Sequence, residues 1–314
     1  MKKYVMGIDI GGRSMKFGLF TTDGELINKS NITTFPENNG EKIIPDLIEH
    51  IKKIIEKFEL TEENFEGIGI GIPGPILNKQ IVKTAVNLGW SEPINIAEKV
   101  KEAVNFKVLV ENDANVAALG EVWKGAGEGY KNLVMVTLGT GVGGGIVIDG
   151  KIVSGSTGSA GEIGHMPFLQ TPLHRTCGCG GHRCFEQKAS APGIENIAND
   201  YLFEHEGESE LRDIDSISAK DIFDAAKNDD KYALEIVDEY TNDLGRGLAI
   251  ISAIVDPEIY VLGGGVSNAG QFLLEKTQEA YKEVAFSVTK DVKFTLAKLG
   301  NDAGIYGAAK LILS

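Results

Sequence analysis

The sequence predicts an α/β fold built from two related lobes, with helices packed on sheets. Short apolar runs alternate along the chain with longer segments in which apolar residues recur at helical spacing, which is the pattern of strands that alternate with helices. A unit of strand, glycine-rich turn, strand, turn and strand begins near residue 4 and returns near residue 133. One unit that occurs twice at such a separation indicates two lobes rather than a repeat array.

The first unit consists of three short strands. The apolar run Tyr4–Ile10 ends in glycines, Lys16–Phe20 follows, and the turn Asp23-Gly24 leads into Glu25–Ser30. Farther along, isoleucines and leucines at helical spacing predict a helix over Glu41–Phe58. The other segments predicted in this half are strands over 67–72 and 107–111 and helices over 94–104 and 114–123.

The second unit opens with a strand over Leu133–Leu138 and a dense glycine turn. We find no Pro/Ser-rich linker between the units, so we expect two closely packed lobes with a cleft between them. The small lobe is predicted to comprise residues 1–118 and 302–314, and the large lobe residues 119–301. Further predicted strands are 144–148, 151–153, 258–262 and 292–297, and predicted helices are 192–201, 219–226, 231–255, 268–284 and 302–312.

Composition excludes several classes of protein. The chain has 314 residues, of which 42% are hydrophobic and 24% charged, and its net charge is −14. This charge argues against a surface for nucleic acid or anionic membrane, so a polyanionic ligand must be held by local donors or a metal. The sequence begins with a strand-like run rather than a signal peptide, and no apolar stretch is long enough to span a bilayer. Together with reduced thiols, these features predict a cytoplasmic protein.

The three cysteines of the chain all lie in the eight residues from Cys177 to Cys184. An odd number of crowded thiols suits a disulfide framework poorly, but three thiolates and one imidazole form a closed tetrahedral site for Zn²⁺. The upstream His165 is the preferred fourth ligand because Gly164 allows a close approach, while His174 and His182 remain alternatives. The predicted zinc ligands are His165, Cys177, Cys179 and Cys184, with Glu162 and Glu186 at the two ends of the loop.

Three glycine clusters are candidates for phosphate binding. Asp9-Ile10-Gly11-Gly12 combines backbone N–H groups with a carboxylate that suits hydrated Mg²⁺, although a plain hairpin turn explains it equally well. The cluster Gly139–Gly145 is followed by a strand and lacks the lysine of a P-loop, which favours a phosphate-binding hairpin. Gly263–Gly265 follows a buried strand and precedes a predicted helix, as at a nucleotide site on a helix N-terminus.

The pair Asn112-Asp113 lies where a predicted buried strand ends and a helix begins. Asp at such a position is commonly an N-cap. The alternative is a general base that accepts the proton of a substrate hydroxyl, with Asn112 on a neighbouring hydroxyl.

These motifs together resemble the ROK family (repressor, open reading frame, kinase), and most closely its bacterial glucokinases. The resemblance covers nearly the whole chain. The matching stretches, in order, are DIGG at 9–12, GIPGP at 71–75, NLGW at 87–90, ENDAN at 111–115, LGTGVGGG at 138–145, GEIGH at 161–165 and CGCGGHRCFE at 177–186.

The resemblance implies an actin-like (ribonuclease H-like) two-lobed ATPase fold with the catalytic cleft between the lobes. It implies Asp113 as the catalytic base and a zinc-bound His165 that also contacts sugar. The implied sugar-binding residues are Gly74, Asn87, Asn112, Asp113, Glu162, His165 and Glu186. The residues implied for ATP and Mg²⁺ are Asp9, Gly11, Gly12, Arg13, Thr140 and Gly141 at the phosphates, with Gly263 and Gly264 beside the adenosine.

The implied activity is ATP-dependent phosphorylation of a hexose, with glucose at its 6-hydroxyl as the expected substrate. An N-acetylmannosamine, N-acetylglucosamine or other hexose kinase is the alternative within the enzymes. A sugar-responsive ROK repressor is disfavoured, because the chain begins at the first core strand with no helix-turn-helix segment ahead of it. A homodimer or homotetramer is expected from the family alone.

Two positions depart from the family pattern. Arg13 stands where threonine is usual, which leaves it either at the phosphates or in solvent. Arg183 stands where glycine is usual, so it is strained if the position requires a positive φ.

Overall fold

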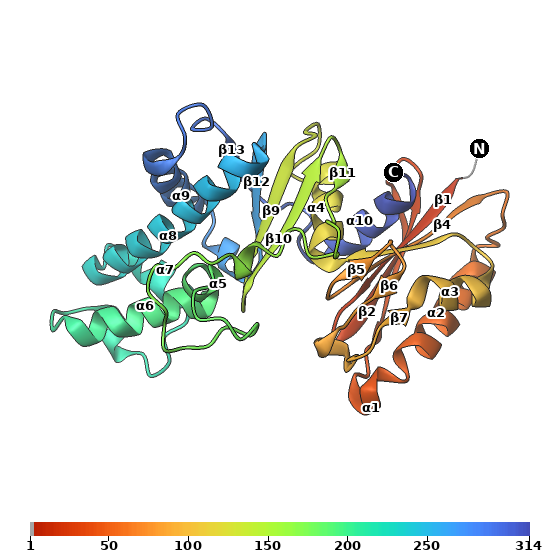
Figure 1. Ribbon diagram of the computed structural model, residues 1–314, viewed down its shortest axis with the longest axis horizontal. Coiled ribbons are helices and arrows are strands. Elements are labelled where there is room, and N and C mark those ends of the chain that lie inside the picture. Colours follow the sequence, from red (N-terminus) through yellow and green to blue (C-terminus); the bar gives the residue numbers. More distant parts are fainter. Residues whose placement is uncertain (1–2) are drawn as a thin grey trace. The chain divides into compact units, whose positions relative to one another are not determined.

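The computed structural model describes residues 3–314 and divides into two compact units (Figure 1). Unit 1 comprises 1–133, 145–161 and 298–314, and unit 2 comprises 134–144 and 162–297. The predicted lobe boundary after residue 118 falls inside helix α4 (Asp113–Lys124), which belongs to unit 1 throughout. The two divisions therefore differ, and the predicted lobe limits stay a prediction.

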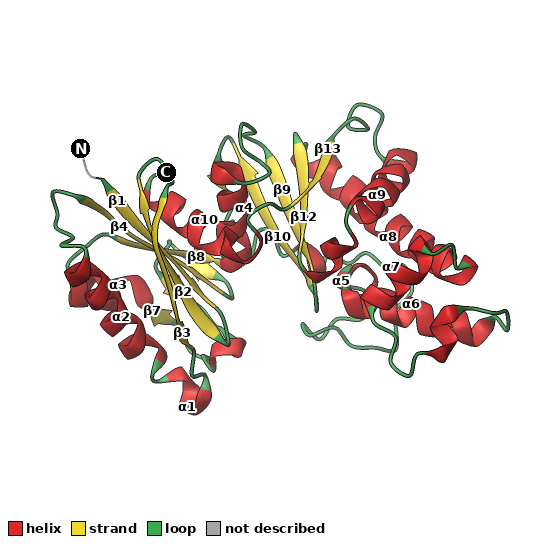
Figure 2. Ribbon diagram, turned by 180° about the vertical axis from the view of Figure 1, so that it is seen from behind, coloured by secondary structure: helices red, strands yellow, loops and turns green. Residues whose placement is uncertain are grey.

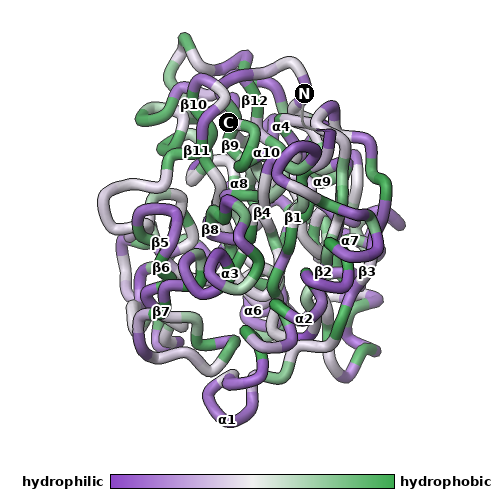
Figure 3. The backbone as a smooth tube through the Cα atoms, turned by 90° about the vertical axis from the view of Figure 1, so that its right-hand side faces the viewer, coloured by the Kyte–Doolittle hydropathy of each residue, from purple (hydrophilic) through white to green (hydrophobic). Residues whose placement is uncertain are grey.

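The sheet of unit 1 has the strand order β3-β2-β1-β4-β8. The first three strands form an antiparallel meander, and β4 and β8 join β1 in parallel. The strands β1 and β4 are apolar almost throughout, as expected for strands that are buried on both faces, and Figure 3 shows the hydrophobic colour along β1. The strands are β1 (Tyr4–Ile10), β2 (Ser14–Thr21), β3 (Leu26–Thr33), β4 (Phe65–Ile72) and β8 (Val108–Asn112).

Helices cover both faces of this sheet (Figure 2). On one face, α2 (Ile43–Lys57) and α3 (Ile96–Val104) contribute their apolar sides to the core formed with the strands. On the other face, α10 (Ala303–Ile312) packs on β1 and β4 beside α4. A Cβ added at Gly69 would lie 1.7 Å from the carbonyl oxygen of Ala308, so glycine in β4 is what allows α10 to approach so closely.

The second sheet repeats this strand order as β11-β10-β9-β12-β13. The prediction of two related units is confirmed at the level of the strand order. Its strands are β9 (Leu133–Leu138), β10 (Val142–Ile148), β11 (Lys151–Ile152), β12 (Ile259–Gly263) and β13 (Lys293–Leu296).

The helices of unit 2 form a packed layer around the long α8 (Lys231–Val255). Asp230 caps this helix by accepting the N–H of Ala233, and the left-handed Asp256 ends it. The buried side chains of Tyr240, in α8, and Tyr260, in β12, pack on its inner side. The other helices of unit 2 are α5 (Glu186–Ala189), α6 (Ala191–Glu204), α7 (Ala219–Lys227) and α9 (Gln271–Val284), with the 3-10 turns η2 (Ile163–His165), η3 (Glu210–Asp213) and η4 (Gly265–Ala269).

The sequence pattern missed a small three-stranded sheet in unit 1. Residues Ile94–Asn95 were predicted as the start of a helix, but they pair with β6 before α3 begins at Ile96. Runs of two residues carry no periodic signal, so only tertiary pairing defines them. The remaining elements of unit 1 are β5 (Ile76–Leu77), β6 (Ile81–Val82), β7 (Ile94–Asn95), α1 (Glu37–Gly40), η1 (Val86–Leu88) and η5 (Gly300–Asp302).

Within the described part of the chain, every helix is too short or too polar to cross a bilayer.

Candidate functional site

The structure gathers the four predicted metal ligands into one cluster in unit 2. The ligand atoms of His165, Cys177, Cys179 and Cys184 all lie within 4.8 Å of one another. The Sγ atoms of Cys179 and Cys184 are 3.4 Å apart, near the ~3.8 Å that two thiolates have on a tetrahedral Zn²⁺. A third thiol and an imidazole complete a donor set that fits Zn²⁺.

The cluster selects His165 over the alternative histidines. Its Nδ1 lies 3.5 Å from Sγ of Cys177. In contrast, Nδ1 of His182 lies 3.0 Å from the carbonyl oxygen of Leu173, and neither His182 nor His174 belongs to the cluster.

Backbone hydrogen bonds shape the loop around the cysteines. The N–H of Cys177 donates to the carbonyl of Gly181, and the N–H of Gly180 donates to the carbonyl of Cys177. Gly180 has φ +86°, which only glycine adopts readily. A Cβ added at Gly181 would lie 3.0 Å from Sγ of Cys184 and 3.3 Å from Sγ of Cys179, so the thiols need a glycine there too.

The surroundings shift the pKa values of the three thiols in different directions. Burial and the hydrogen bond to Glu186 raise the pKa of Cys177, and burial also raises the pKa of Cys184. The N–H of Gly181 lowers the pKa of Cys179. A metal that binds the two buried thiols must therefore displace their protons.

His165 has a carboxylate near each of its ring nitrogens. Its Nδ1, on the cluster side, is 3.8 Å from Oε1 of Glu186, while its Nε2 is 4.0 Å from Oε2 of Glu162. The other oxygen of Glu186 accepts the N–H of Val142, 3.3 Å away, and a Cβ at Gly141 would clash with it. Glu186 thus connects the metal loop with the glycine turn of residues 139–142.

In unit 1, the polar pair lies at the junction of β8 and α4 as predicted. Asn112 is the N-cap, since its Oδ1 accepts the N–H groups of Ala114 and Asn115 at 2.9 and 3.2 Å. Its Nδ2 donates to the carbonyl of Gly74, which lies in the turn after β4. Asp113 is the first residue of the helix and is half-buried. The alternative of an N-cap at Asp113 is therefore wrong, because Asn112 occupies that position.

Two predicted segments of unit 1 lie against each other at Gly12. A Cβ added there would lie 3.1 Å from the carbonyl oxygen of Asn87, so the turn after β1 lies next to the NLGW segment. Asn87 itself is exposed on η1. The N–H of Gly11 donates to the carbonyl of Ser14, which closes the turn.

Asp9 has a cationic neighbour that the sequence analysis missed. Lys16 is its cross-strand partner in the β1–β2 register, and the ammonium lies 3.1 Å from Oδ2 of Asp9 and 3.0 Å from the carbonyl of Asn301. Cross-strand partners point to the same face of a sheet. The lysine in the strand after the turn was therefore the sequence feature that could have predicted this contact.

The structure shows the surroundings of Arg13 and Arg183, the two residues that depart from the family pattern. Arg13 is exposed, and its carbonyl accepts the N–H of Thr34. Arg183 is absent from the residues with positive φ among those described, and its carbonyl accepts the N–H groups of Phe168 and Leu169. The condition for backbone strain at Arg183, a positive φ, is therefore not met, and the left-handed glycine of this loop is Gly180.

The start of the second glycine cluster lies next to the third cluster, and both belong to unit 2. Gly264 has φ +85°, and a Cβ there would lie 2.4 Å from the carbonyl oxygen of Leu138, immediately before the turn that holds Thr140 and Gly141. The helix predicted over 268–284 after the third cluster is present but begins three residues later. The 3-10 turn η4 follows the cluster, and α9 begins only at Gln271.

A pocket of about 240 Å³ opens beside this third cluster. It lies between η4 and α7, and α7 supplies Phe223 and Lys220, which the sequence analysis did not identify. Their signal is weak, because an amphipathic helix with an inward aromatic looks like ordinary core. The lining residues are Ala219, Lys220, Phe223, Asp224, Gly265, Val266, Asn268 and Ala269.

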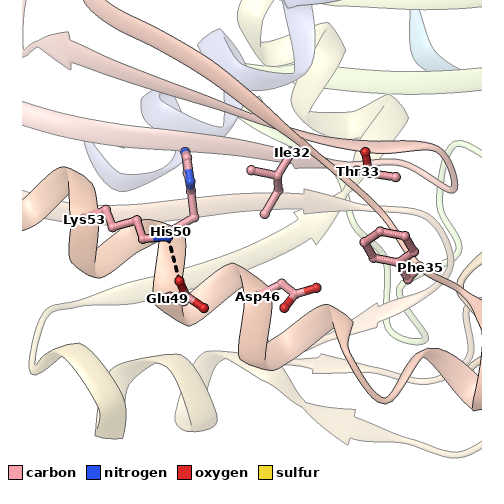
Figure 4. Close-up of a pocket in the computed structure, with 7 residues that line it drawn as sticks. All are labelled: Ile32, Thr33, Phe35, Asp46, Glu49, His50 and Lys53. Atoms are coloured by element: carbon pink, nitrogen blue, oxygen red, sulfur yellow. Dashed lines mark ion pairs between the residues drawn. The ribbon is translucent and has the colours of Figure 1, made fainter.

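A different pocket, of about 390 Å³, lies between β3 and α2 in unit 1 (Figure 4). It is lined by Ile32, Thr33, Phe35, Asp46, Glu49, His50 and Lys53, and none of these is a predicted site residue. The predicted residues described here are distributed as follows: Asp9, Gly11, Gly12, Arg13, Gly74, Asn87, Asn112 and Asp113 lie in unit 1, and Thr140, Gly141, Glu162, His165, the cysteines, Glu186, Gly263 and Gly264 in unit 2.

Comparison with known proteins gives a consistent result. The model described as "ROK family" matches residues 5–314. A glucokinase of Halalkalibacterium halodurans is 39% identical over 99% of this chain and 95% of its own length. An N-acetyl-D-glucosamine kinase of Mannheimia succiniciproducens is 29% identical over 98% of this chain and 99% of its own.

A solved structure agrees with these sequence matches. The ROK family glucokinase from Streptomyces griseus, in complex with glucose and AMPPNP, has a TM-score of 0.75 and 31% sequence identity to this chain, with 98% of each chain covered. The predicted actin-like α/β fold class is confirmed by this likeness and by the repeated strand order.

Proposed function

The chain belongs to the ROK family, and on that premise we propose that it is an ATP-dependent hexose kinase that converts glucose to glucose 6-phosphate. The observation that carries the proposal is the β8–α4 junction. Asn112 caps the helix, and the half-buried Asp113 beside it accepts the N–H of Ala114 through Oδ1 at 2.9 Å. The position of Asp113 at the first residue of α4 supports its proposed role as the catalytic base.

The proposed chemistry is proton removal at the sugar hydroxyl. Asp113 accepts the proton as the hydroxyl oxygen bonds to the γ-phosphorus of ATP, while the bond from that phosphorus to the bridging oxygen breaks and ADP leaves. Catalysis is otherwise by positioning and charge stabilisation. The proposed sugar-binding residues are Gly74, Asn87, Asn112, Glu162, His165 and Glu186. A polar site of this kind rejects analogues that lack a hydroxyl, because buried partners are then left unpaired.

We assign the metal cluster to a structural Zn²⁺. His165 is proposed to bind it through Nδ1, the nitrogen near Cys177, and to meet sugar through Nε2, the nitrogen near Glu162. The metal would fix the tautomer and orientation of this ring. Oε1 of Glu186 lies 3.8 Å from Nδ1 of His165, which supports an arrangement in which the metal loop and the proposed sugar-binding residues lie together.

ATP and Mg²⁺ are proposed to bind at the glycine turns. The residues assigned to the phosphates and Mg²⁺ are Asp9, Gly11, Gly12, Arg13, Thr140 and Gly141, and those beside the adenosine are Gly263 and Gly264. The pocket next to Gly264 has the volume and the mixed apolar lining suited to a purine ring, which supports this assignment.

The sugar is the finer part of the proposal. Glucose is favoured by the 39% identity to a glucokinase, while the 29% identity to an N-acetyl-D-glucosamine kinase keeps an N-acetylhexosamine as the alternative. ADP release measured against glucose, mannose, N-acetylglucosamine and N-acetylmannosamine decides between them. We also propose a cytoplasmic homodimer or homotetramer, in keeping with the free thiols of the metal loop.

The first prediction concerns Asp113. We expect Asp113→Ala to lower kcat for glucose by about 10³-fold or more, since the variant loses both the base and the orientation of the hydroxyl. The dissociation constant for glucose, measured by calorimetry, should change by less than about threefold, because Asn112 and the other sugar contacts remain. A kcat close to that of the wild type would remove Asp113 from the mechanism.

A further inference from the structure

A buried carboxylate lies next to the Asn112–Asp113 pair and has no role in the chemistry above. Glu111 is only 1% exposed and is the one acidic residue of β8, a strand that otherwise carries valine and leucine up to Asn112. A buried carboxylate is costly unless several hydrogen bonds compensate for its lost hydration.

The hydrogen bonds of Glu111 use both oxygens. Oε1 accepts the backbone N–H of Asn112 at 2.9 Å and Nδ2 of Asn115 at 3.1 Å. Oε2 accepts the hydroxyl of Ser154 at 2.6 Å. One carboxylate therefore joins the end of β8, the first turn of α4 and a loop that is distant in the sequence.

These contacts act on the backbone that carries the proposed sugar-binding and catalytic groups. The N–H of Asn112 points at Glu111, while the Asn112 side chain caps α4 and bonds the carbonyl of Gly74. Asp113 follows directly, so a shift of the Asn112 peptide displaces both side chains. Reaction rates fall steeply with such displacements, by up to about 100-fold for 1 Å.

The hydrogen bond from Ser154 lets the Glu111 carboxylate hold a second segment of the chain. Ser154 follows β11, its carbonyl accepts the N–H of Ala160, and its hydroxyl is held by Glu111. The chain then reaches Glu162, a proposed sugar-binding residue, eight positions after Ser154. Glu111 thus fixes both the Asn112–Asp113 segment and the start of the loop that leads to Glu162.

We propose that Glu111 is a positioning residue for phosphoryl transfer, which holds Asn112 and Asp113 in register with the Ser154 loop through its buried carboxylate. This role rests on the proposed function. Glu111 touches neither sugar nor nucleotide in this scheme and acts only through the groups that it bonds.

The experiment compares steady-state kinetics of Glu111→Gln, Ser154→Ala and the double variant, using the sugar that the wild type phosphorylates best. We expect Glu111→Gln to lower kcat by about tenfold or more, and Ser154→Ala, which removes a single donor, by about two- to tenfold. The double variant should be about as slow as Glu111→Gln alone, since Glu111→Gln already removes the charged acceptor of the Ser154 hydroxyl. KM for ATP should stay within about twofold in all three.

Ser252→Ala is the matched control. The Ser252 hydroxyl is buried in unit 2, accepts the hydroxyl of Tyr281 and lies 2.9 Å from that of Tyr260. The control loses a comparable buried hydrogen bond, and its kcat should equal that of the wild type at a similar loss of melting temperature.

The outcomes separate the two proposals. A wild type that shows no hexose-dependent ADP release overturns the proposed function and this role with it. If the wild type is active, two results overturn the positioning role alone. In the first, Glu111→Gln and Ser154→Ala keep kcat within twofold of the wild type. In the second, KM for ATP rises by the same factor as kcat falls. If Glu111→Gln does not fold, the milder Ser154→Ala still decides by its kcat relative to Ser252→Ala.

Discussion

At the scale of single residues, His50 is a helix side chain that packs against the sheet of unit 1. The sequence pattern places it on the surface of α2, but the ring is half-buried against Phe17, with the centroids 4.4 Å apart. Its Nε2 lies 2.8 Å from Oγ of Ser30. Burial, and then the charge of Lys53, lowers the pKa of His50, and Figure 4 shows both side chains at the pocket between β3 and α2.

The lowered pKa of His50 predicts acid sensitivity. The folded state holds the imidazole neutral, whereas in the unfolded chain it binds a proton near its ordinary pKa of about 6.5. The contribution to stability is therefore complete above that pH and is lost as the pH falls through the lower folded-state pKa. We expect the free energy of unfolding, from urea titrations between about pH 7 and pH 5, to fall less steeply in His50→Gln than in the wild type. Equal slopes would mean that the ring contributes nothing.

At the scale of elements, the metal loop combines ligand spacing with backbone shape. The sequence predicted the three cysteine ligands from composition and spacing, with His165 preferred over His174 and His182 as the fourth. The structure adds that two thiols lie close to Gly181, where a side chain would meet them. Gly178 in the same loop has open space around it. The two glycines thus offer a test in which only the position of one methyl group differs.

For this loop we predict that Gly181→Ala weakens metal binding and Gly178→Ala does not. The added methyl group of Gly181→Ala lies 3.0 Å from Sγ of Cys184, so a ligand must move and tetrahedral geometry suffers. Competition with a chromophoric chelator should show a zinc affinity at least about tenfold lower for Gly181→Ala. Equal affinities in the two variants would show that the loop adapts freely.

At the scale of the whole molecule, the residues proposed to bind the nucleotide ring and the sugar hydroxyl belong to two different compact units. The pocket beside Gly264 belongs to unit 2, and Ala269 lines it from η4. The carboxylate–amide junction around Asn112 belongs to unit 1. A ligand that binds only the folded state raises the free energy of unfolding by about 2.7 kcal/mol at a concentration of 100 Kd.

We therefore predict a selective loss of nucleotide binding in Ala269→Trp. The indole fills the pocket of about 240 Å³, so a non-hydrolysable ATP analogue should no longer raise the melting temperature, while glucose should raise it as in the wild type. Ala253→Trp, on the exposed side of α8, is the control and should respond to both ligands. Full nucleotide stabilisation in Ala269→Trp would place the purine elsewhere.

Much of the local structure was predictable because its causes are local. The isoleucines at helical spacing in α2 and the apolar run of β4 gave the correct element types, with the first residue of each shifted by two positions. The two-residue strands β5, β6 and β7 were not predictable, because they exist only through pairing with one another. The turn η4 was missed because a five-residue 3-10 segment resembles the first turn of a helix in sequence.

The sequence by itself determined the α/β class, the repeated unit, the three crowded cysteines with His165 as the preferred fourth ligand, and the resemblance that led to the kinase proposal. Each of these depends on residue types and on spacing along the chain. Only the tertiary structure decided that Asn112 rather than Asp113 caps α4, that Lys16 meets Asp9, and that Glu111 bonds Ser154. These contacts join residues through strand register and through burial in three dimensions. A carboxylate in a strand shows its purpose only when the donors around it are known.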